Sequence, residues 1–320
     1  MKLRYLVMTL ILLSVTSIFI GVVNITPRSL LNLTEHDKNI LLNSRIPRTI
    51  SIILAGVALS VAGLLMQQLT RNKFVSPTTA GTMDFAKLGI LIAMIFFTDA
   101  PILVKLLFAV TSAIIGTMVF MWIVRRIKYK DAIFIPLVGL MLGNVVSSLA
   151  TFMALRFNAM QSIGNFFVGD FSMITKGRYE IMIIIIPMVV LIYVFAHHFT
   201  IVGMGESFSR NLGISYDKIM NLGIVIAAVV SATVVVTIGV LPFLGLIVPN
   251  IVNLFVGDHL QKTLPSTALL GAILVMVADI FSRLIIFPYE IPIGLTLGIL
   301  GSVIFMGLLL MRRKSYAEKI

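Results

Sequence analysis

Long apolar segments recur along this chain of 320 residues and are separated by short charged loops. Examples are Tyr5–Val23, Thr49–Leu69, Ile102–Val124 and Ile291–Leu310. A helix rises about 1.5 Å per residue and the hydrocarbon core of a bilayer is about 30 Å thick, so each segment can cross a membrane as a helix. A soluble core does not need so many such segments. The sequence therefore predicts an all-α, polytopic transmembrane helix bundle, with residues 1–320 forming a single domain.

We expect about ten membrane spans. They are residues 5–24, 49–69, 78–97, 101–124, 132–153, 180–197, 219–239, 241–256, 265–287 and 291–311. The eighth is short and carries Pro242, Gly245 and Pro249, so we expect it to be broken or half-buried. The first follows Lys2 and Arg4, as a signal peptide would. It is longer than a usual signal h-region and no small-x-small site follows, so we interpret it as a span.

The distribution of Lys and Arg predicts the orientation of the bundle. With the N-terminus inside, the inside set is Lys2, Arg4, Arg71, Lys73, Arg125, Arg126, Lys128, Lys130, Arg210, Lys218, Lys262, Arg312, Arg313, Lys314 and Lys319. The outside set is Arg28, Lys38, Arg45, Arg48, Arg156, Lys176 and Arg178, while Lys87, Lys105 and Arg283 fall within spans or at their edges. Cytoplasmic loops carry the excess of basic residues, so both termini are predicted to be cytoplasmic and the number of spans even.

Composition excludes several other classes of protein. Hydrophobic residues make up 59% of the chain and charged residues 12%, so the net charge of +12 is assigned to cytoplasmic loops rather than to nucleic-acid binding. Cysteine is absent, which excludes disulfides and thiolate metal sites. The four histidines have no metal-ligand spacing, and neither a Walker A motif, a His-Glu-x-x-His motif nor a serine nucleophile elbow occurs. We therefore expect no enzyme activity, no cofactor and no metal site.

Two segments between spans differ from simple loops. The external segment Asn158–Arg178 contains several aromatic residues and predicts an interfacial or surface helix. The internal segment Gly203–Lys218 is the longest polar stretch on the cytoplasmic side. Within it, Glu206 and Arg210 have the i,i+4 spacing of a helical pair, and Gly213 suits a helix C-terminal cap. The pattern predicts a short amphipathic helix on the cytoplasmic face.

Motifs spread along the chain carry a family resemblance. They are Arg45-Ile46-Pro47-Arg48-Thr49, Gly56…Gly63-Leu64-Leu65-Met66-Gln67, Arg71-Asn72-Lys73-Phe74…Pro77, Gly205-Glu206…Leu212-Gly213, Gly245-Leu246-Ile247-Val248-Pro249 and Ala278-Asp279…Arg283…Glu290-Ile291-Pro292-Ile293-Gly294. In this order the chain resembles the FecCD type of ABC importer permease, which serves iron–siderophore complexes and vitamin B12. The resemblance implies a multi-pass permease in a bacterial cell membrane, surrounded by membrane lipid.

The resemblance also implies partners. A second permease subunit, either a copy or a paralogue, would complete the passage; two separate ATPase subunits would drive it, and an extracytoplasmic binding protein or lipoprotein would deliver a ferric siderophore. The chain departs from the family pattern at Asn72-Lys73-Phe74, where Asn-Pro-Leu is common, and at Asn250 and Asn253, which replace His and Arg. The Thr- and Asp-containing loop at residues 76–84 is more similar to permeases for ferric catecholate siderophores than to the B12 branch.

The resemblance assigns docking of the binding protein to three arginines, Arg45, Arg48 and Arg283. A planar guanidinium grips a carboxylate bidentately, which suits this role. The alternative for Arg45 and Arg48 is that they anchor the span to lipid headgroups. The alternative for Arg283 is an intrahelical i,i+4 pair with Asp279. Both alternatives stay open at this point.

Two further sets of residues are assigned in the same way. The resemblance assigns coupling to the ATPase to Gly205, Glu206, Arg210, Leu212 and Gly213. The alternative is that this segment is an ordinary surface loop. The resemblance places Asn72, Phe74, Ser147 and Ser148 in a cytoplasmic gate. The alternatives are a simple turn for Asn72 and close helix packing through small side chains for the serines.

An ion- or proton-driven secondary transporter is the rival function. Such carriers commonly use a lone acidic residue in mid-span. Here the acidic residues of the spans have basic neighbours at helical spacing, Asp84 with Lys87 and Asp279 with Arg283, and intramembrane charges are expected to be paired. This pairing counts against the rival.

Overall fold

The computed structural model describes residues 2–21, 23, 34–97, 99–127 and 133–317 of the chain. Within these ranges every regular element is a helix, as predicted. The basic residues expected at Arg28, Lys128, Lys130 and Lys319 lie outside the described residues.

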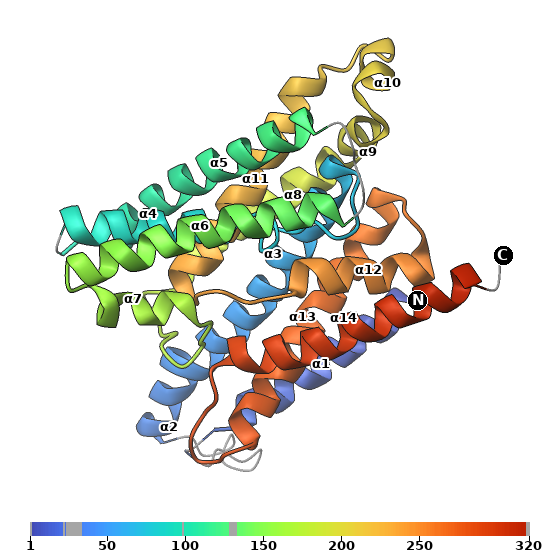
Figure 1. Cartoon of the computed structure of the whole chain (residues 1–320). Coiled ribbons are helices and arrows are strands. Elements are labelled where there is room, and N and C mark those ends of the chain that lie inside the picture. Colours follow the sequence, from blue (N-terminus) through green and yellow to red (C-terminus); the bar gives the residue numbers. More distant parts are fainter. Residues whose placement is uncertain (1, 22, 24–33, 98, 128–132, 318–320) are drawn as a thin grey trace.

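The helices follow one another with short connections (Figure 1). They are α1 (Leu3–Phe19), α2 (Glu35–Ile40), the π-helix η2 (Leu41–Arg45), α3 (Ile46–Thr70), α4 (Thr82–Phe96), α5 (Ile102–Arg126), α6 (Phe134–Arg156), α7 (Met160–Phe167), the 3-10 helix η3 (Tyr179–Ile184), α8 (Ile185–Val194), α9 (Ala196–Met204), α10 (Glu206–Asn211), α11 (Tyr216–Thr237), α12 (Leu244–Val256), α13 (Leu260–Leu284) and α14 (Ile293–Ala317).

Each predicted span coincides with a helix, and the polytopic helical fold is confirmed. Among the described residues, five helical stretches are long and apolar enough to cross a bilayer, namely Glu35–Thr70, α5, α6, α11 and α13. A sixth crossing is formed if η3 with α8 and α9 count as one span, which bends by 59°. The helices α1, α4, α12 and the apolar part of α14 are shorter, so the number of ten stays a prediction. As expected for the eighth span, α12 has only 13 residues and begins after Phe243, whose φ is +65°.

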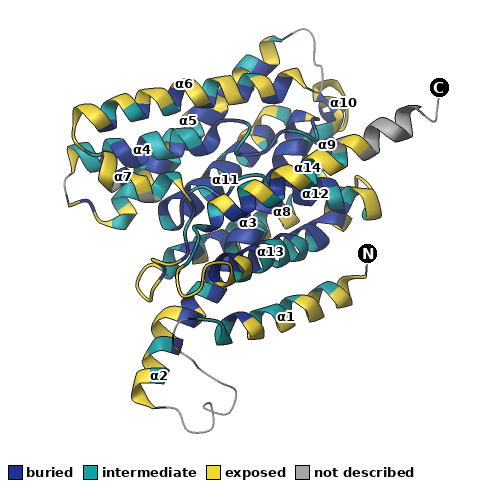
Figure 2. Cartoon of the chain, turned by 60° about the horizontal axis from the view of Figure 1, so that its bottom comes forward, coloured by how far each residue is buried: buried dark blue, intermediate teal, exposed yellow. Residues whose placement is uncertain are grey.

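Helix α3 forms the centre of the bundle. It packs against α13, α11 and α12, and most of its side chains are buried, whereas α1, α5, α6 and α14 each leave a broad exposed face (Figure 2). Small residues let the helices approach: Gly56 lies against the backbone of Gly271 and Ala272, and Gly63 lies against the backbone of Gly245. Membrane helices lack a hydrophobic driving force between them, so such close packing is a main source of their association.

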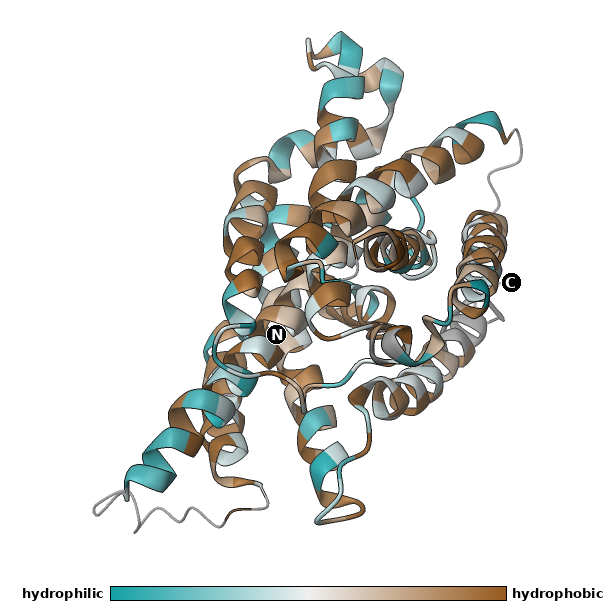
Figure 3. Ribbon diagram, turned by 90° about the vertical axis from the view of Figure 1, so that its left-hand side faces the viewer, coloured by the Kyte–Doolittle hydropathy of each residue, from teal (hydrophilic) through white to brown (hydrophobic). Residues whose placement is uncertain are grey.

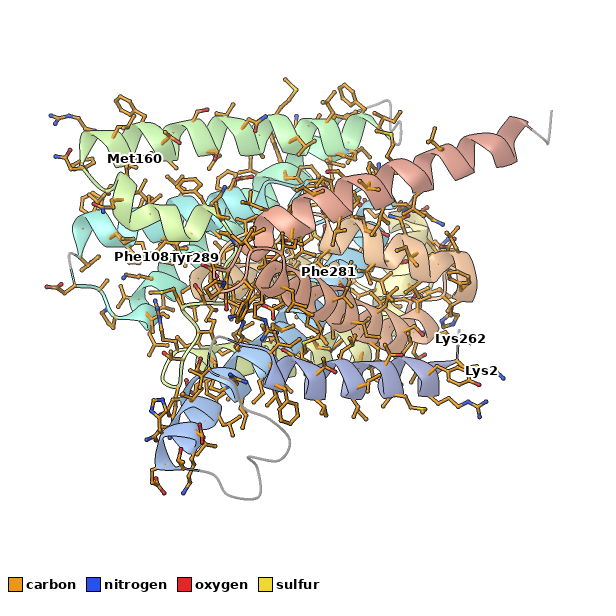
Figure 4. All side chains as sticks on the ribbon, turned by 90° about the horizontal axis from the view of Figure 1, so that it is seen from below. Lys2, Phe108, Met160, Lys262, Phe281 and Tyr289 are labelled. Atoms are coloured by element: carbon orange, nitrogen blue, oxygen red, sulfur yellow. The ribbon has the colours of Figure 1, made fainter. Side chains whose placement is uncertain are left out.

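The two ends of the bundle differ in what they carry. The start of α1, the C-terminal part of α14 and α10 lie at one end, while α2 and α7 lie toward the opposite end (Figure 1). Hydrophilic residues gather toward the tips and the middle is mainly hydrophobic (Figure 3). Lys2 and Lys262, both predicted inside, lie on the same side in Figure 4, far from Met160 at the start of α7. Following the predicted orientation, we call these the cytoplasmic end and the outer end.

Candidate functional site

A buried ion cluster joins α3, α13 and the segment before α14 at the outer end. The Arg48 guanidinium donates to Asp279 Oδ1 at 2.8 Å and to Glu290 Oε2 at 2.8 Å, and Arg283 Nη2 lies 2.5 Å from Asp279 Oδ2. The Asp279 side chain is fully buried, and those of Arg48 and Arg283 are 13% and 5% exposed. Charges this deep are stable only when paired, so the four side chains act as one unit. We call them the outer ion cluster.

The arginines of this region also hold the C-terminal end of α1. Arg283 Nη1 donates to the carbonyls of Ser17 and Ile20, at 3.0 and 2.8 Å, and Arg283 Nη2 donates to Ser17 Oγ. Arg45 donates to the carbonyls of Ile18 and Val23. The last carbonyls of a helix have no partner within it, so these guanidinium groups complete the hydrogen bonding of α1.

The three arginines predicted to dock a binding protein therefore lie together. They line one cavity of about 180 Å³ at the outer end, with Ser44 and Glu290 on its wall. The Asp279–Arg283 pair expected at i,i+4 is confirmed, and Arg48 reaches across to α13 rather than outward to lipid headgroups. Docking itself stays a prediction. The sequence analysis named Glu290 only as part of a motif and did not name Ser17. No pattern in the residues around either position predicts contact with a distant arginine.

The cytoplasmic end carries the predicted short helix, α10, and its capping is confirmed. Glu206 and Arg210 form the expected pair at 2.8 Å. Gly213 has a φ of +72°; its N–H donates to Arg210 O at 3.0 Å, and Ile214 N–H donates to Ser209 O at 2.9 Å. These two bonds form a Schellman motif, which requires a left-handed residue and favours glycine.

Contacts tie α10 to its neighbours while part of its surface stays uncovered. Asp217, at the start of α11, lies 3.3 Å from Arg125 of α5 and 3.9 Å from Arg210. Three apolar side chains spaced by four residues are exposed to solvent at this end. They are Met204, Phe208 and Leu212. These apolar side chains lie beside the ion pairs of α10.

The gate candidates Asn72 and Phe74 lie in the loop between α3 and α4. Asn72 Oδ1 accepts a hydrogen bond from Phe74 N–H at 2.9 Å and so forms a local turn, while the gate role stays a prediction. The Phe74 ring meets Phe305 of α14 edge-on at 6.0 Å. Asn250 Nδ2 donates to Lys73 O at 2.7 Å. Two positions that depart from the family pattern, Lys73 and Asn250, therefore contact each other.

The other gate candidates, Ser147 and Ser148, lie on α6, which packs against α4, α5 and α7. The loop after α3 meets α6 at Gly139, which lies against Thr79 and Ala80, and the two serines lie about two helical turns further along α6. The Ser147 carbonyl accepts from Thr151 Oγ1 at 2.9 Å, and Ser148 is exposed together with Asn144 on an otherwise apolar face. Polar side chains facing lipid are unfavourable, so this face is suited to a partner or to an aqueous passage.

Helix α4 carries a further ion pair within the spans. Lys87 Nζ lies 2.6 Å from Asp84 Oδ1, as the i,i+3 spacing predicted. Nowhere in the described ranges do three or more His, Asp or Glu side chains gather in a way that could hold a metal ion.

Comparisons with known proteins agree with this geometry. Residues 9–312 match the FecCD transport family. The chain is 55% identical over 317 residues to the petrobactin import system permease protein YclN of Bacillus subtilis (strain 168), covering 99% of this chain and all of that one. It is 40% identical over 303 residues to the ferric-anguibactin transport system permease protein FatD of Vibrio anguillarum, covering 95% of this chain and 96% of that one.

A solved structure has the same fold. It is an inward-facing conformation of a metal-chelate type ABC transporter, with a TM-score of 0.83 and 20% sequence identity, covering 97% of this chain and 98% of that one. A second, PsaBC from Streptococcus pneumoniae in complex with Fab, matches with a TM-score of 0.60 and 14% identity over 88% of this chain and 93% of that one.

Proposed function

Since this chain belongs to the FecCD transport family and is a permease subunit of an ABC importer for metal chelates, we propose that its cargo is a ferric siderophore of the petrobactin type. The observation that carries the proposal is the identity of 55% to a petrobactin permease along the whole of both chains. A secondary transporter is no longer a rival, and the chain is not an enzyme.

Iron uptake in a deletion strain tests the cargo. We expect loss of this permease to abolish uptake of labelled ferric petrobactin and a plasmid copy to restore it. The control chelate is ferric citrate, after which two relatives of lower identity are named. Its uptake should not change. Unchanged petrobactin uptake in the deletion strain would contradict the assignment.

The permease pairs with another permease and with ATPase subunits. ATP is bound by those separate subunits, because this sequence holds no Walker A motif. We place it in the bacterial cytoplasmic membrane. ATP binding would shift an equilibrium between inward- and outward-facing states through differential contacts with the permease. The exposed face of α6 with Asn144 and Ser148 supports contact with the second permease or with the passage between the two.

The segment Gly203–Lys218 is proposed to receive the motion of the ATPase. Its support is the exposed apolar row of Met204, Phe208 and Leu212 beside the ion pairs of Glu206 and Arg210. A cleft in a partner would cover the apolar side chains. The Arg210–Asp217 pair joins α10 to α11, and the Arg125–Asp217 pair joins α11 to α5, so a push on α10 would move α11 and, through it, α5.

Gly213→Val is expected to reduce uptake severalfold while the protein still inserts. No atom lies within 4 Å of a Cβ at this position, so the change acts through the left-handed backbone alone, at a cost of about 1–2 kcal/mol. Labelled-iron uptake and ATPase co-purification are measured together. Gly177→Val is the matched control, since Gly177 has a φ of +95° and open space at the outer end. Equal uptake in the two variants would show that α10 does not couple the ATPase to transport.

Docking of an extracytoplasmic binding protein is proposed at the cavity lined by Arg45, Arg48 and Arg283. A carboxylate of the partner entering this cavity would meet three guanidinium groups. Arg45 is the one arginine of the three that bonds only to carbonyls in the described structure, so it can be changed without leaving a buried acid unpaired.

Arg45→Gln is expected to weaken association of the binding protein about fivefold, mainly through a slower on-rate, and to reduce its salt dependence. The measurement is binding to the assembled importer in nanodiscs at several salt concentrations. Lys38→Gln is the control, because it changes the same charge on the nearby α2 without lining the cavity. If both variants bind alike, Arg45 serves only to hold α1.

A further inference from the structure

We propose that a second cavity at the outer end, between α4, α5, α7 and α11, binds the phosphate group of an anionic membrane lipid. Two adjoining hollows of about 220 and 110 Å³ share the side chains of Lys105, Phe166, Arg178 and Val236 on their walls. This lipid cavity lies on a different part of the bundle from the outer ion cluster, and no step of the transport cycle described above uses it.

Its two cations have no partner in the described part of the chain. The Lys105 side chain, in the first turn of α5, and the Arg178 side chain, just before η3, form no ion pair or hydrogen bond with another described residue. One acid, Asp170, also lines the larger hollow, but both its oxygens already accept from Ser172 at 2.8 Å. Two cations and one carboxylate therefore line the lipid cavity, which leaves one net positive charge there.

The start of α5 adds to the positive potential there. Pro101 caps the helix without a side-chain hydrogen bond, and the first turn holds no acidic residue. Free N–H groups and the positive end of the helix dipole thus lie beside Lys105 and add to its attraction for an anion.

The surroundings favour a lipid over a soluble anion. Met94, Ile102 and Phe166 form apolar walls, and the opposite face of α5 exposes Leu103 and Leu107, which are 59% and 64% exposed. In a membrane that face meets acyl chains, while the first turn of α5 reaches headgroup depth. Ligand pockets for drug-sized molecules are about 300–1,000 Å³, and the two hollows, of about 220 and 110 Å³, are each smaller and suit a phosphate group.

Lipid binding to the assembled importer tests the proposal. The probe is fluorescent phosphatidylglycerol, titrated into phosphatidylcholine nanodiscs. We expect Lys105→Gln with Arg178→Gln to weaken its apparent affinity about thirtyfold, because each basic residue near the surface contributes about 1 kcal/mol toward an anionic lipid. The control is Lys176→Gln, which removes a charge from the same loop but not from the lipid cavity. Both changed side chains lack hydrogen bonds, and co-purification of the ATPase verifies that the variants fold.

Each outcome decides the question. Equal phosphatidylglycerol affinity in the wild type, the double variant and the control would overturn the proposal. Displacement of the lipid by millimolar inorganic phosphate in the wild type would instead assign the cavity to free phosphate. Weaker association of the binding protein, with unchanged lipid affinity, would make these cations a docking surface and would also overturn it.

Discussion

Asp279→Asn is expected to unfold the outer end of the bundle, lowering the free energy of unfolding by about 3–5 kcal/mol. The Asp279 carboxylate is fully buried and bridges Arg48 and Arg283. Arg48 would still have Glu290, but Arg283 would lose the one carboxylate that it contacts among the described residues. A buried guanidinium without a counter-charge is the costly state. Thermal unfolding of the purified chain in detergent measures the loss.

Two companion variants separate charge balance from simple packing. Glu290→Gln should cost far less, because its side chain is 27% exposed and Arg48 keeps Asp279. Asp279→Leu combined with Arg283→Met removes both members of the buried pair and should recover much of the stability, as an apolar replacement of a whole ion pair often does. A double variant as unstable as Asp279→Asn would show that the hydrogen bonds of Arg283 to α1, rather than its charge, hold the outer end.

Local patterns in the sequence predicted the elements of this fold and the pairs within one element. Apolar runs located the helices because membrane-spanning backbone must satisfy its own hydrogen bonds. The i,i+4 spacing predicted both Glu206–Arg210 and Asp279–Arg283, and Gly213 predicted the cap of α10, because each depends only on neighbours along one helix.

Local sequence patterns did not predict the contacts between distant segments. Arg48 meets Glu290 across 242 positions, and Arg45 meets carbonyls of α1, so their burial could not be inferred from the residues around them. The sixth span was expected to end at residue 197, but the helix continues to Met204 after a bend of 59°, and no proline or glycine at Phe195 signals this bend. The two pairs of gate candidates were grouped by resemblance, which does not determine that α6 meets the loop after α3 at Gly139 rather than at Ser147 and Ser148.

A single methyl group at Gly63 is expected to force α3 and α12 apart. A Cβ at this position would meet the carbonyl carbon, the carbonyl oxygen and the Cα of Gly245, all of which are backbone atoms. A clash with a flexible side chain can be relieved by another rotamer, but here one of the two helices must move. We expect Gly63→Ala to cost about 1–3 kcal/mol, the usual range for overpacking.

The shift would also reach the cytoplasmic loop, since Gln67, one turn further along α3, donates to Gly245 O at 3.3 Å. Thermal unfolding and labelled-iron uptake of Gly63→Ala should therefore both fall. Gly164→Ala is the matched control: it adds the same methyl to a helical glycine with no atom within 4 Å, and alanine is the better helix former, so its stability should not decrease. Wild-type stability in Gly63→Ala would contradict the close approach of α3 and α12, on which the packing of α12 against the centre of the bundle depends.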